Sequence, residues 1–219
     1  RLCYIWHCYA HYCLYGKIYI SMKPKALTDN DYKFAAEELD CEPAIIKAFA
    51  EVESSGYGFW QFSDTDWRPK ILFEAHWFHK FTNGIYDKSH PSISSPVWNK
   101  ELYYYGKKEY NRLDEACALN REAGLKSASW GKFQIMGFNY SRCGYRILQD
   151  FINDMYHSEL GHLNAFIGFI LSDIKLLAAL RTKDFATIAF RYNGSGNVEI
   201  YAKRIESVYQ QYLSLENKI

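Results

Sequence analysis

This chain has no clear excess of either positive or negative charge. It has 26 Lys and Arg against 25 Asp and Glu, which gives a formal net charge of +1 at pH 7. A chain with so little net charge has no overall electrostatic attraction to nucleic acid or to an anionic membrane surface. We expect no nucleic-acid partner, no stable membrane insertion and a monomeric protein.

The sequence also lacks the cysteine patterns of a disulfide scaffold or a zinc site. Three of its six cysteines lie within the first 13 residues, the others are at positions 41, 117 and 143, and no C-x-x-C pair occurs. Scattered cysteines of this kind are typical of free thiols. A Gly-rich phosphate loop and a G-x-S-x-G motif are missing too, which argues against the commonest nucleotide-binding and serine-hydrolase sites.

One small cluster has the residue types of a metal site but not the spacing. Glu74, His76 and His79 are close together in the sequence. The two histidines are three positions apart, whereas a helical zinc-protease motif places them four apart, and no further ligand cluster is nearby. We expect no metal ion and no other cofactor.

No apolar run is long enough to cross a membrane. The uncharged stretch before Lys17 contains two histidines, falls short of the roughly 20 residues of a membrane-spanning helix and has no small-residue cleavage site. Met22 then opens a conventional start. We expect residues 1–21 to be an N-terminal extension outside the fold, or else an appended hydrophobic arm, and residues 22–219 to form the functional domain. Without a clear signal peptide, synthesis in the cytoplasm is expected.

What the sequence does contain is enough apolar and aromatic material for one well-buried domain. Of its 219 residues, 48% are hydrophobic and 18% are aromatic. That length suits a single domain better than two. Most aromatic rings fill cores, but Tyr and Trp also stack on sugar faces while their polar edges form hydrogen bonds.

Hydrophobic periodicity predicts a mostly helical chain. A capping signal at Thr28 starts a helix to about Asp40, and a second helix is expected from Pro43 to Glu53. A hairpin is expected within residues 59–74. Further helices are expected at 75–81, 110–125, 147–157, 159–171, 176–180, 185–192 and 202–213, with a loop at 86–100. The predicted fold class is therefore mainly α (α+β), with one small sheet inserted after the second helix.

Three short motifs bear the residue types of a sugar-cleaving site. They are Glu53-Ser54 at a helix end, the Gly-x-x-Gln segment 131–134 and the Tyr-Asn-Gly turn 192–194. Glycoside hydrolysis needs a carboxylic acid whose pKa is raised by apolar surroundings, so that it can protonate the leaving oxygen. Glu53 suits this role, although a solvated helix-end carboxylate would have the same sequence. Glu51 would point about 160–200° away from it on the helix.

A second carboxylate is required if the enzyme holds a water molecule for an inverting attack, at roughly 6.5–9.5 Å from the acid. Glu74 is favoured, because it ends the second strand of the expected hairpin and can face the helix end across a cleft. Asp64 and Asp66 in the hairpin turn, and Asp87 beyond it, are the other candidates. Glu74 would equally suit the N-terminus of the helix that follows.

Amide side chains suit the N-acetyl and hydroxyl groups of an amino sugar, because each has both donors and an acceptor. Gln134 and Asn193 are therefore expected to bind substrate, and Tyr192 to hydrogen-bond the acid or pack under the sugar. Ser54 and Trp130, from the same motifs, complete the expected substrate-binding residues. The Tyr-Asn-Gly turn would also fit a helix C-cap.

Longer strings surround these motifs. They are Pro-Lys-Ile-Leu-Phe-Glu-Ala-His at 69–76, the segment 89–96, and Ser-Ala-Ser-Trp-Gly-Lys-Phe-Gln-Ile-Met-Gly at 127–137. Together they resemble the N-acetylmuramidase family of phage endolysins and bacterial cell-wall lytic proteins, from about Thr28 to Tyr212. The resemblance implies a lysozyme-like fold, related to goose-type lysozymes and lytic transglycosylases, in which the small sheet flanks a cleft.

The resemblance also implies site residues. It gives Glu53 as the catalytic acid and places Gln134, Tyr192 and Asn193 along the glycan cleft. The role of Glu74 does not follow from it, because goose-type relatives have no agreed equivalent and transglycosylases need no second carboxylate. No separate peptidoglycan-binding module is recognisable, so the cleft itself is expected to bind the glycan.

The function expected from these residues is a peptidoglycan hydrolase that cleaves the β-1,4 bond between N-acetylmuramic acid and N-acetylglucosamine. Its partner would be the glycan strand, and it would act on the cell wall, in the periplasm or outside the cell, after holin-mediated release. One alternative is a lytic transglycosylase, which leaves 1,6-anhydro-N-acetylmuramic acid ends. Another is a glycan-binding protein without catalytic activity.

Overall fold

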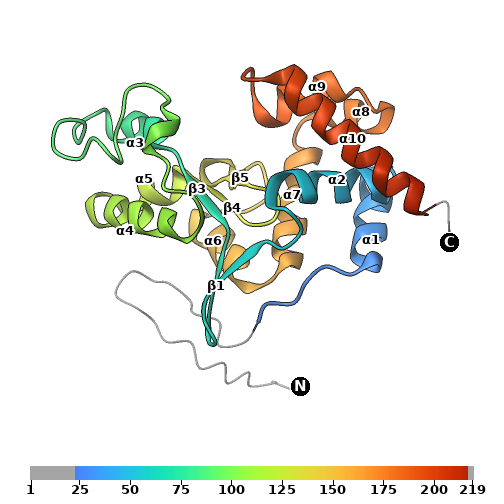
Figure 1. Cartoon of the computed structure of the whole chain (residues 1–219), viewed down its shortest axis with the longest axis horizontal. Coiled ribbons are helices and arrows are strands. Elements are labelled where there is room, and N and C mark those ends of the chain that lie inside the picture. The colour runs from blue at the N-terminus through green and yellow to red at the C-terminus, as the bar shows by residue number, and fades with distance from the viewer. Residues whose placement is uncertain (1–22, 217–219) are drawn as a thin grey trace.

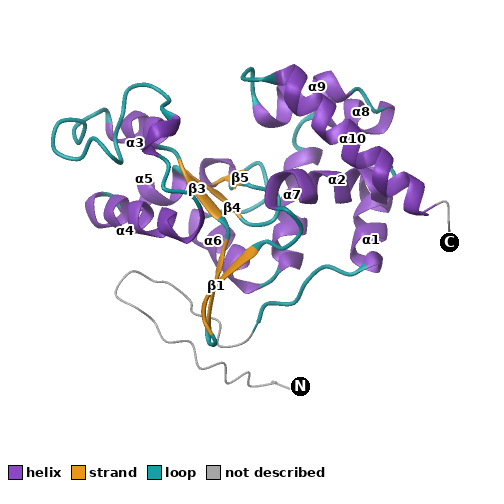
Figure 2. Ribbon diagram, viewed as in Figure 1, coloured by secondary structure: helices purple, strands orange, loops and turns teal. Residues whose placement is uncertain are grey.

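The computed structural model describes residues 23–216 and has a mainly helical fold with two small antiparallel sheets (Figure 2). Its α-helices are α1 (Asp29–Leu39), α2 (Pro43–Ser54), α3 (Ala75–Thr82), α4 (Glu109–Leu119), α5 (Arg121–Lys126), α6 (Leu148–His157), α7 (Glu159–Leu171), α8 (Ile174–Thr182), α9 (Phe185–Asn193) and α10 (Val198–Glu216). Its strands are β1 (Phe59–Ser63), β2 (Asp66–Pro69), β3 (Ile71–Phe73), β4 (Ala128–Trp130) and β5 (Ile135–Met136). The predicted fold class is confirmed. The expectation for residues 1–21 lies outside the described residues.

Local sequence signals start and end the first two helices. Asp31 N donates to Thr28 Oγ1 at 3.3 Å and Thr28 N donates to Asp31 Oδ2 at 2.7 Å, which is a capping box. α2 begins at Pro43. Proline has no backbone N–H, and in the first turn of a helix that N–H would have no partner within the helix. Its C-cap is Ser55 at a left-handed φ of 52°. The carboxylate of Glu53 therefore lies in the last turn of a helix whose end is sharply defined.

The β-structure differs from the single hairpin that the sequence predicts. β1 and β2 do form a hairpin, but β3 pairs with β4, and β5 completes a second sheet in the order β3-β4-β5. The chain changes sheets at Lys70, whose N–H donates to Gly58 O at 2.7 Å and whose carbonyl accepts from Gly131 N at 2.7 Å. The prediction missed this pairing because β4 lies far along the chain, where no local pattern shows its partner.

The single helix predicted over residues 110–125 is also wrong, because α4 and α5 are separate helices that meet at Asn120. Asn120 has an extended φ of −153°, and its side-chain oxygen accepts from Ala123 N at 3.0 Å. A side-chain cap of this kind competes with continuation of the preceding helix. The other helices begin within two residues of their predicted starts, except α10, which begins four residues earlier at Val198.

The elements form two groups with α7 between them (Figure 1). In that view α3–α6 and the β3-β4-β5 sheet lie to the left, and α1, α2 and α8–α10 lie to the right. α7 is a core helix, with Leu163, Phe166 and Ile170 all 0% exposed, and α10 packs along α2. Within residues 23–216 no single helix has the length and hydropathy of a membrane span. Only α7 and α8 taken together have that length and hydropathy, and the two helices are bent by 103° relative to each other.

Candidate active site

Glu53 lies in the last turn of α2, where α10 packs against it. Its Oε1 accepts a hydrogen bond from the hydroxyl of Tyr201 in α10. Arg204, one helical turn further along α10, is near enough to act on Glu53 through its charge. Sequence reasoning missed Tyr201, because it is one of 19 tyrosines and only the packing of α10 on α2 brings it to the acid.

The surroundings of Glu53 favour its protonated form. Burial raises the pKa of Glu53 from 4.5 to about 7, and the hydrogen bond from Tyr201 and the charge of Arg204 lower it by less. Burial, followed by the charge of Glu53, holds the pKa of both Tyr192 and Tyr201 well above the usual range. Tyr201 therefore remains a donor, and Glu53 keeps its proton to a higher pH than an ordinary glutamate.

A buried ion pair fixes the turn that follows Glu53. Glu159, at the start of α7, accepts from Gly58 N at 2.6 Å and from Lys132 Nζ at 3.0 Å. Lys132 Nζ also donates to the carbonyl of Gly56. The two charged side chains are 0% and 6% exposed. The backbone just beyond the acid is thus tied to α7 and to the turn between β4 and β5.

The polar groups of Ser54 form hydrogen bonds within and next to the end of α2 rather than with a ligand. Its hydroxyl donates to Ala50 O at 2.8 Å, and its carbonyl accepts from Lys70 Nζ at 2.6 Å. The residue is 5% exposed. The prediction that Ser54 binds substrate does not agree with this geometry, because its hydroxyl hydrogen is already donated within the helix.

The Gly-x-x-Gln segment forms the turn between β4 and β5. Gly131 has a φ of +72°, and a Cβ there would lie 2.8 Å from the ring of His162, so glycine is required. His162 Nδ1 accepts from Lys132 N at 3.0 Å, which leaves Nε2 to donate to Met155 O at 2.7 Å. This pair of bonds fits the neutral ring, and burial lowers the pKa of His162 to about 4.

Gln134 uses its side-chain amide inside the same turn. Its Nε2 donates to Gly131 O at 2.8 Å and to Lys70 O at 3.1 Å, while its Oε1 accepts from Ser129 Oγ at 2.8 Å. Both amide hydrogens are therefore used, and only a lone pair of the oxygen is left for a ligand. The predicted donation from Gln134 to a sugar is not supported, and the side chain instead ties the β4–β5 turn to Lys70, between β2 and β3.

The Tyr-Asn-Gly turn ends α9. The hydroxyl of Tyr192 donates to Phe133 O at 2.6 Å, and its ring packs on Phe49 with centroids 4.7 Å apart. Of the two roles predicted for Tyr192, the hydrogen bond to the acid is made by Tyr201 instead, and packing under the sugar stays a prediction. Asn193 is exposed and Gly194 is the C-cap, as the C-cap interpretation expects. Asn193 is thus open to a ligand.

Trp130 lies in the core. It is 1% exposed, and its Nε1 donates to Leu125 O at 3.1 Å. The prediction that it contacts substrate is wrong, because its position on the central strand β4 places the ring inside the protein.

Glu74 lies between β3 and α3. The hydroxyl of Tyr103 is 2.8 and 2.7 Å from its two oxygens, and His76 Nδ1 is 3.3 Å from Oε2. The side chain is 15% exposed. Although Glu74 holds the N-cap position of α3, its side chain makes no capping hydrogen bond. The carboxylate is therefore directed to Tyr103 and His76 rather than to the helix end.

The other candidate carboxylates have different surroundings. Asp64 is exposed at the hairpin turn, and Asp66 pairs with an arginine of its own strand at 2.6 Å. Asp87 accepts from His79 Nδ1 at 2.8 Å, while His76 faces Glu74. Among the described residues no group of three or more His, Cys, Asp or Glu side chains is arranged to hold a metal ion.

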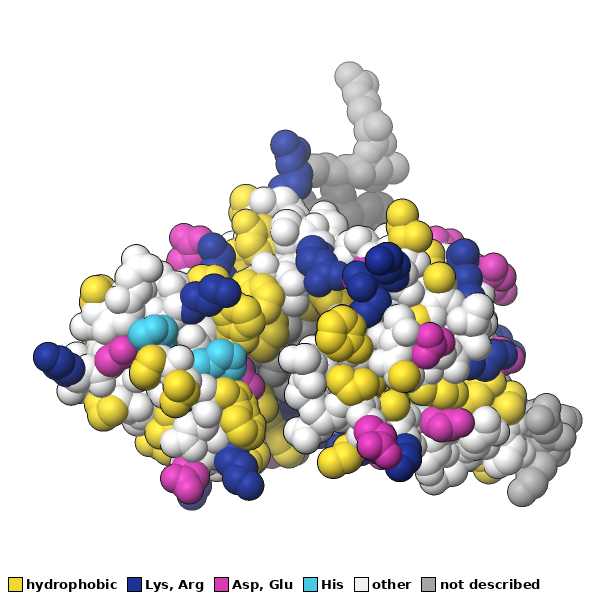
Figure 3. Space-filling view, turned by 90° about the horizontal axis from the view of Figure 1, so that it is seen from above, with side chains coloured by type: hydrophobic (Ala, Val, Ile, Leu, Met, Phe, Trp, Pro, Cys, Tyr) yellow, Lys and Arg dark blue, Asp and Glu magenta, His cyan; other side chains and the backbone are white. Residues whose placement is uncertain are grey.

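The surface is hollowed between the two groups of elements when it is seen from above (Figure 3). Hydrophobic side chains stand on both sides of this hollow. Exposed aromatic side chains include Trp98 and Tyr105, in the loop before α4, and Phe190 in α9. Rings of this kind suit the apolar faces of sugars.

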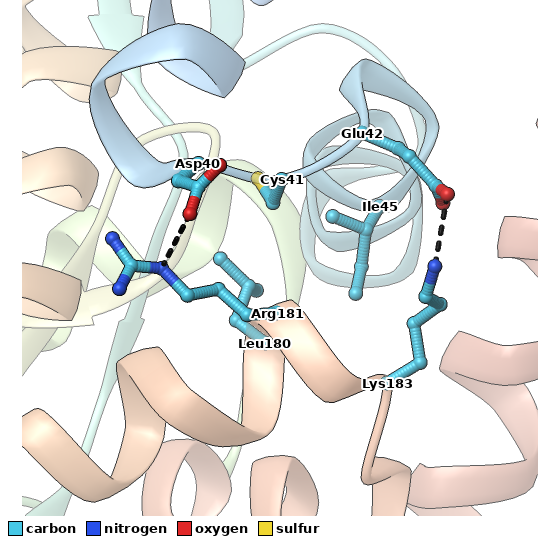
Figure 4. A pocket seen from close by; sticks show the side chains of 7 residues that line it. All are labelled: Asp40, Cys41, Glu42, Ile45, Leu180, Arg181 and Lys183. Carbon is cyan, nitrogen blue, oxygen red and sulfur yellow. Dashed lines mark hydrogen bonds and ion pairs between the residues drawn. The ribbon is translucent and has the colours of Figure 1, made fainter.

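A separate cavity of about 250 Å³ lies at the other end of α2 (Figure 4). Lys183 pairs with Glu42 at 2.9 Å and Arg181 with Asp40 at 3.7 Å on its walls. At 1.5 Å per residue, the helix places this cavity about 16 Å from Glu53. Its charged groups are paired with one another, and we assign it no part in the site.

A mainly helical, two-part fold with a helix-end glutamic acid of raised pKa is that of a lysozyme-like protein. The family model of N-acetylmuramidase matches residues 42–213, and the chain belongs to that family. The chain is also similar to the endolysin of Burkholderia AP3 phage, with a TM-score of 0.75 and 34% identity over 88% of this chain and 73% of the endolysin. A comparison with curated proteins found no match. The resemblance seen in the sequence is confirmed, and the protein is a peptidoglycan-cleaving enzyme.

Proposed function

We propose that the protein hydrolyses the β-1,4 bond between N-acetylmuramic acid and N-acetylglucosamine, with Glu53 as the general acid. The observation that carries this proposal is the half-buried position of Glu53 at the end of α2, under α10, where desolvation raises its pKa to about 7. A carboxyl group that keeps its proton near neutral pH is what protonation of a glycosidic oxygen needs. Membership of the N-acetylmuramidase family supports the choice of bond.

In the proposed reaction Glu53 gives its proton to the bridging oxygen while the bond from that oxygen to the anomeric carbon breaks. The N-acetylglucosamine side leaves as an alcohol. A water molecule attacks the anomeric carbon of N-acetylmuramic acid, and Glu74 takes the proton that this water loses. Proton exchange with solvent then restores both carboxyl groups.

The surroundings of Glu74 support the role of water-holding base. A carboxylate has about four acceptor sites, and Tyr103 and His76 are the groups that contact its oxygens among the described residues. Acceptor sites therefore remain for a water molecule, and the side chain is partly exposed. Asn193, exposed at the end of α9, is the amide that remains open to the substrate.

We place the reaction at the cell wall, after release from the cytoplasm through a holin-made membrane lesion. The family and the phage endolysin relative support the site of action. Expression in cells without any phage lysis gene should keep the protein inside, and its export from such cells would contradict this route.

Mass spectrometry of the soluble products tests the reaction. Purified protein is incubated with peptidoglycan, and the proposal predicts fragments that end in a free reducing N-acetylmuramic acid. Anhydro ends, lighter by one water, would make the enzyme a transglycosylase and leave Glu74 without a catalytic role. No cleavage by protein with Glu53 intact would favour a glycan-binding protein.

A further inference from the structure

Glu74 is the end of a chain of hydrogen bonds with a fixed direction. Trp98 Nε1 is 2.7 Å from the hydroxyl of Tyr103, and that hydroxyl is 2.8 and 2.7 Å from the two oxygens of Glu74. An indole N–H can only donate, so the phenol oxygen accepts from it and the phenol hydrogen is left for the carboxylate. Glu74 is therefore held as an acceptor.

A buried ion pair connects this loop to β3, the strand that ends just before Glu74. Glu109 accepts from the N–H groups of Tyr104 and Tyr105 at 2.6 and 2.9 Å and from Phe73 N at 3.2 Å. Arg112 pairs with Glu109 at 3.0 Å and donates to Phe73 O at 2.8 Å. Both side chains are 0% exposed. The pair thus fixes the last residue of β3 and the residues that follow Tyr103 to one another.

The loop backbone is strained at the point where this pair holds it. Tyr105 has a φ of 54°, a left-handed value that bulky residues rarely adopt. A buried ion pair is by itself weak evidence of stabilisation, because desolvation opposes the attraction. A costly pair and a strained tyrosine next to a functional carboxylate are typical of a preorganised site.

We propose that Tyr103, oriented by Trp98, is a positioning residue that holds Glu74 as a hydrogen-bond acceptor for the proton of the attacking water. This inference rests on the proposed role of Glu74 in hydrolysis. The ring of Trp98 is 59% exposed, so the chain of donors starts at the protein surface.

The charged and titratable groups around Glu74 fit this role. His76 Nδ1 is 3.3 Å from Glu74 Oε2, and the guanidinium of Arg112 lies 6.0 Å from the ring centre of Tyr103, beside Glu109. Burial, then the hydrogen bond and charge of Glu74, hold the pKa of Tyr103 well above its usual range, and Trp98 and Arg112 lower it by less. Tyr103 therefore stays protonated and remains a donor at all pH values at which the enzyme would be assayed.

The test compares kcat, KM and pH profiles of Tyr103→Phe, Trp98→Phe and the double variant on soluble peptidoglycan fragments. Tyr103→Phe should lower kcat about 10- to 100-fold with KM nearly unchanged, because a hydrogen bond to a charged group is lost. The acidic limb of the profile should move to higher pH, since a carboxylate that loses a donor is protonated more readily. Trp98→Phe should act in the same direction with a smaller effect, and the double variant should be no worse than Tyr103→Phe.

Tyr104→Phe is the matched control, because it removes from the same loop a hydroxyl that makes no hydrogen bond among the described residues, and it keeps the backbone N–H that donates to Glu109. It should leave kcat, KM and the pH profile unchanged. Circular dichroism and a thermal melt of each variant check folding, and Trp98→Phe keeps the test open if Tyr103→Phe is unstable.

Glu74→Gln separates failure of this inference from failure of the proposed function. If Glu74→Gln loses activity while Tyr103→Phe keeps the wild-type kcat and pH profile, the positioning role is contradicted and the role of Glu74 remains. A rise in KM alone would also contradict it, because that is the effect of a sugar-binding residue. If Glu74→Gln is fully active, the role of Glu74 itself fails.

Discussion

Glu53 and Glu74 both accept a hydrogen bond from a tyrosine, yet their surroundings differ. Glu53 has the hydroxyl of Tyr201 on one oxygen, and burial raises its pKa to about 7. Glu74 has the hydroxyl of Tyr103 within 2.8 Å of both oxygens and His76 at 3.3 Å from one of them. The first setting favours a neutral acid, and the second offers donors to a carboxylate.

If the proposed roles hold, the number and direction of hydrogen-bond donors, and not burial alone, distinguish the acid from the base. Glu159 extends the comparison, because it is buried but accepts from the N–H groups of Gly58 and Leu27 and from Lys132. A carboxylate with that many donors serves to hold the chain together. In the proposed reaction the two settings serve different roles, a protonated acid at Glu53 and a carboxylate that accepts hydrogen bonds at Glu74.

Glu53→Gln should have the largest effect on activity, and it tests directly whether Glu53 and Glu74 have different roles. General acid catalysis contributes about 10²- to 10⁴-fold, so we expect turnover of peptidoglycan to fall at least a hundredfold, measured as released reducing ends. Glu51→Gln is the matched control on the same helix and should retain activity. Full activity of Glu53→Gln would place the acid elsewhere.

Lys132→Met tests whether Glu159, unlike Glu53 and Glu74, serves to stabilise the fold. It leaves Glu159 buried without its cation, and loss of one partner of a buried pair costs about 3–5 kcal/mol. The free energy of unfolding, measured by urea titration, should fall by that amount. Lys203→Met, which removes an exposed pair with Glu199, should change it by no more than about 0.5 kcal/mol.

The pH dependence of the unfolding free energy tests whether the fold raises the pKa of Glu53. The folded state raises the pKa of Glu53 from 4.5 to about 7, so the folded protein binds more protons than the unfolded chain in that window. Stability from this group is fully present below pH 4.5 and is lost as the pH rises through 7, by roughly 3 kcal/mol. His162, whose pKa falls from 6.5 to about 4, acts with the opposite sign, and stability is lost as the pH falls from 6.5 to 4.

The two contributions offset each other between about pH 4.5 and 6.5 in the wild type. Glu53→Gln removes one of them, so its unfolding free energy minus that of the wild type should rise by roughly 3 kcal/mol from pH 4.5 to 7. Urea titrations of both proteins across this range give the difference directly. A difference independent of pH would show that Glu53 is not perturbed by the fold.

Tyr201→Phe should give the smallest effect. The hydrogen bond from Tyr201 lowers the pKa of Glu53, so its removal should shift the alkaline limb of the pH–rate profile to higher pH, by about half a pH unit to one. The profile of kcat/KM measures this limb. A shift to lower pH would contradict the assigned donor.

The sequence predicts the helical fold well, because capping signals and apolar periodicity are local. It does not predict that β3 pairs with β4, nor that Tyr201 reaches Glu53, because both depend on packing between distant segments. Trp130 and Gln134 are predicted to bind substrate from their motif alone, and that prediction also fails for want of information on packing. Their motif is distinctive, but it serves a turn packed on His162 rather than an open surface.

The carboxyl titration of Glu53 tests the central claim most directly. Carbon NMR of protein labelled at the glutamate carboxyl groups, compared with Glu53→Gln, identifies the resonance of Glu53. The account predicts that this resonance titrates near pH 7. A midpoint near the ordinary value of 4.5 would show that Glu53 is ionised at neutral pH, and it would contradict its role as the acid.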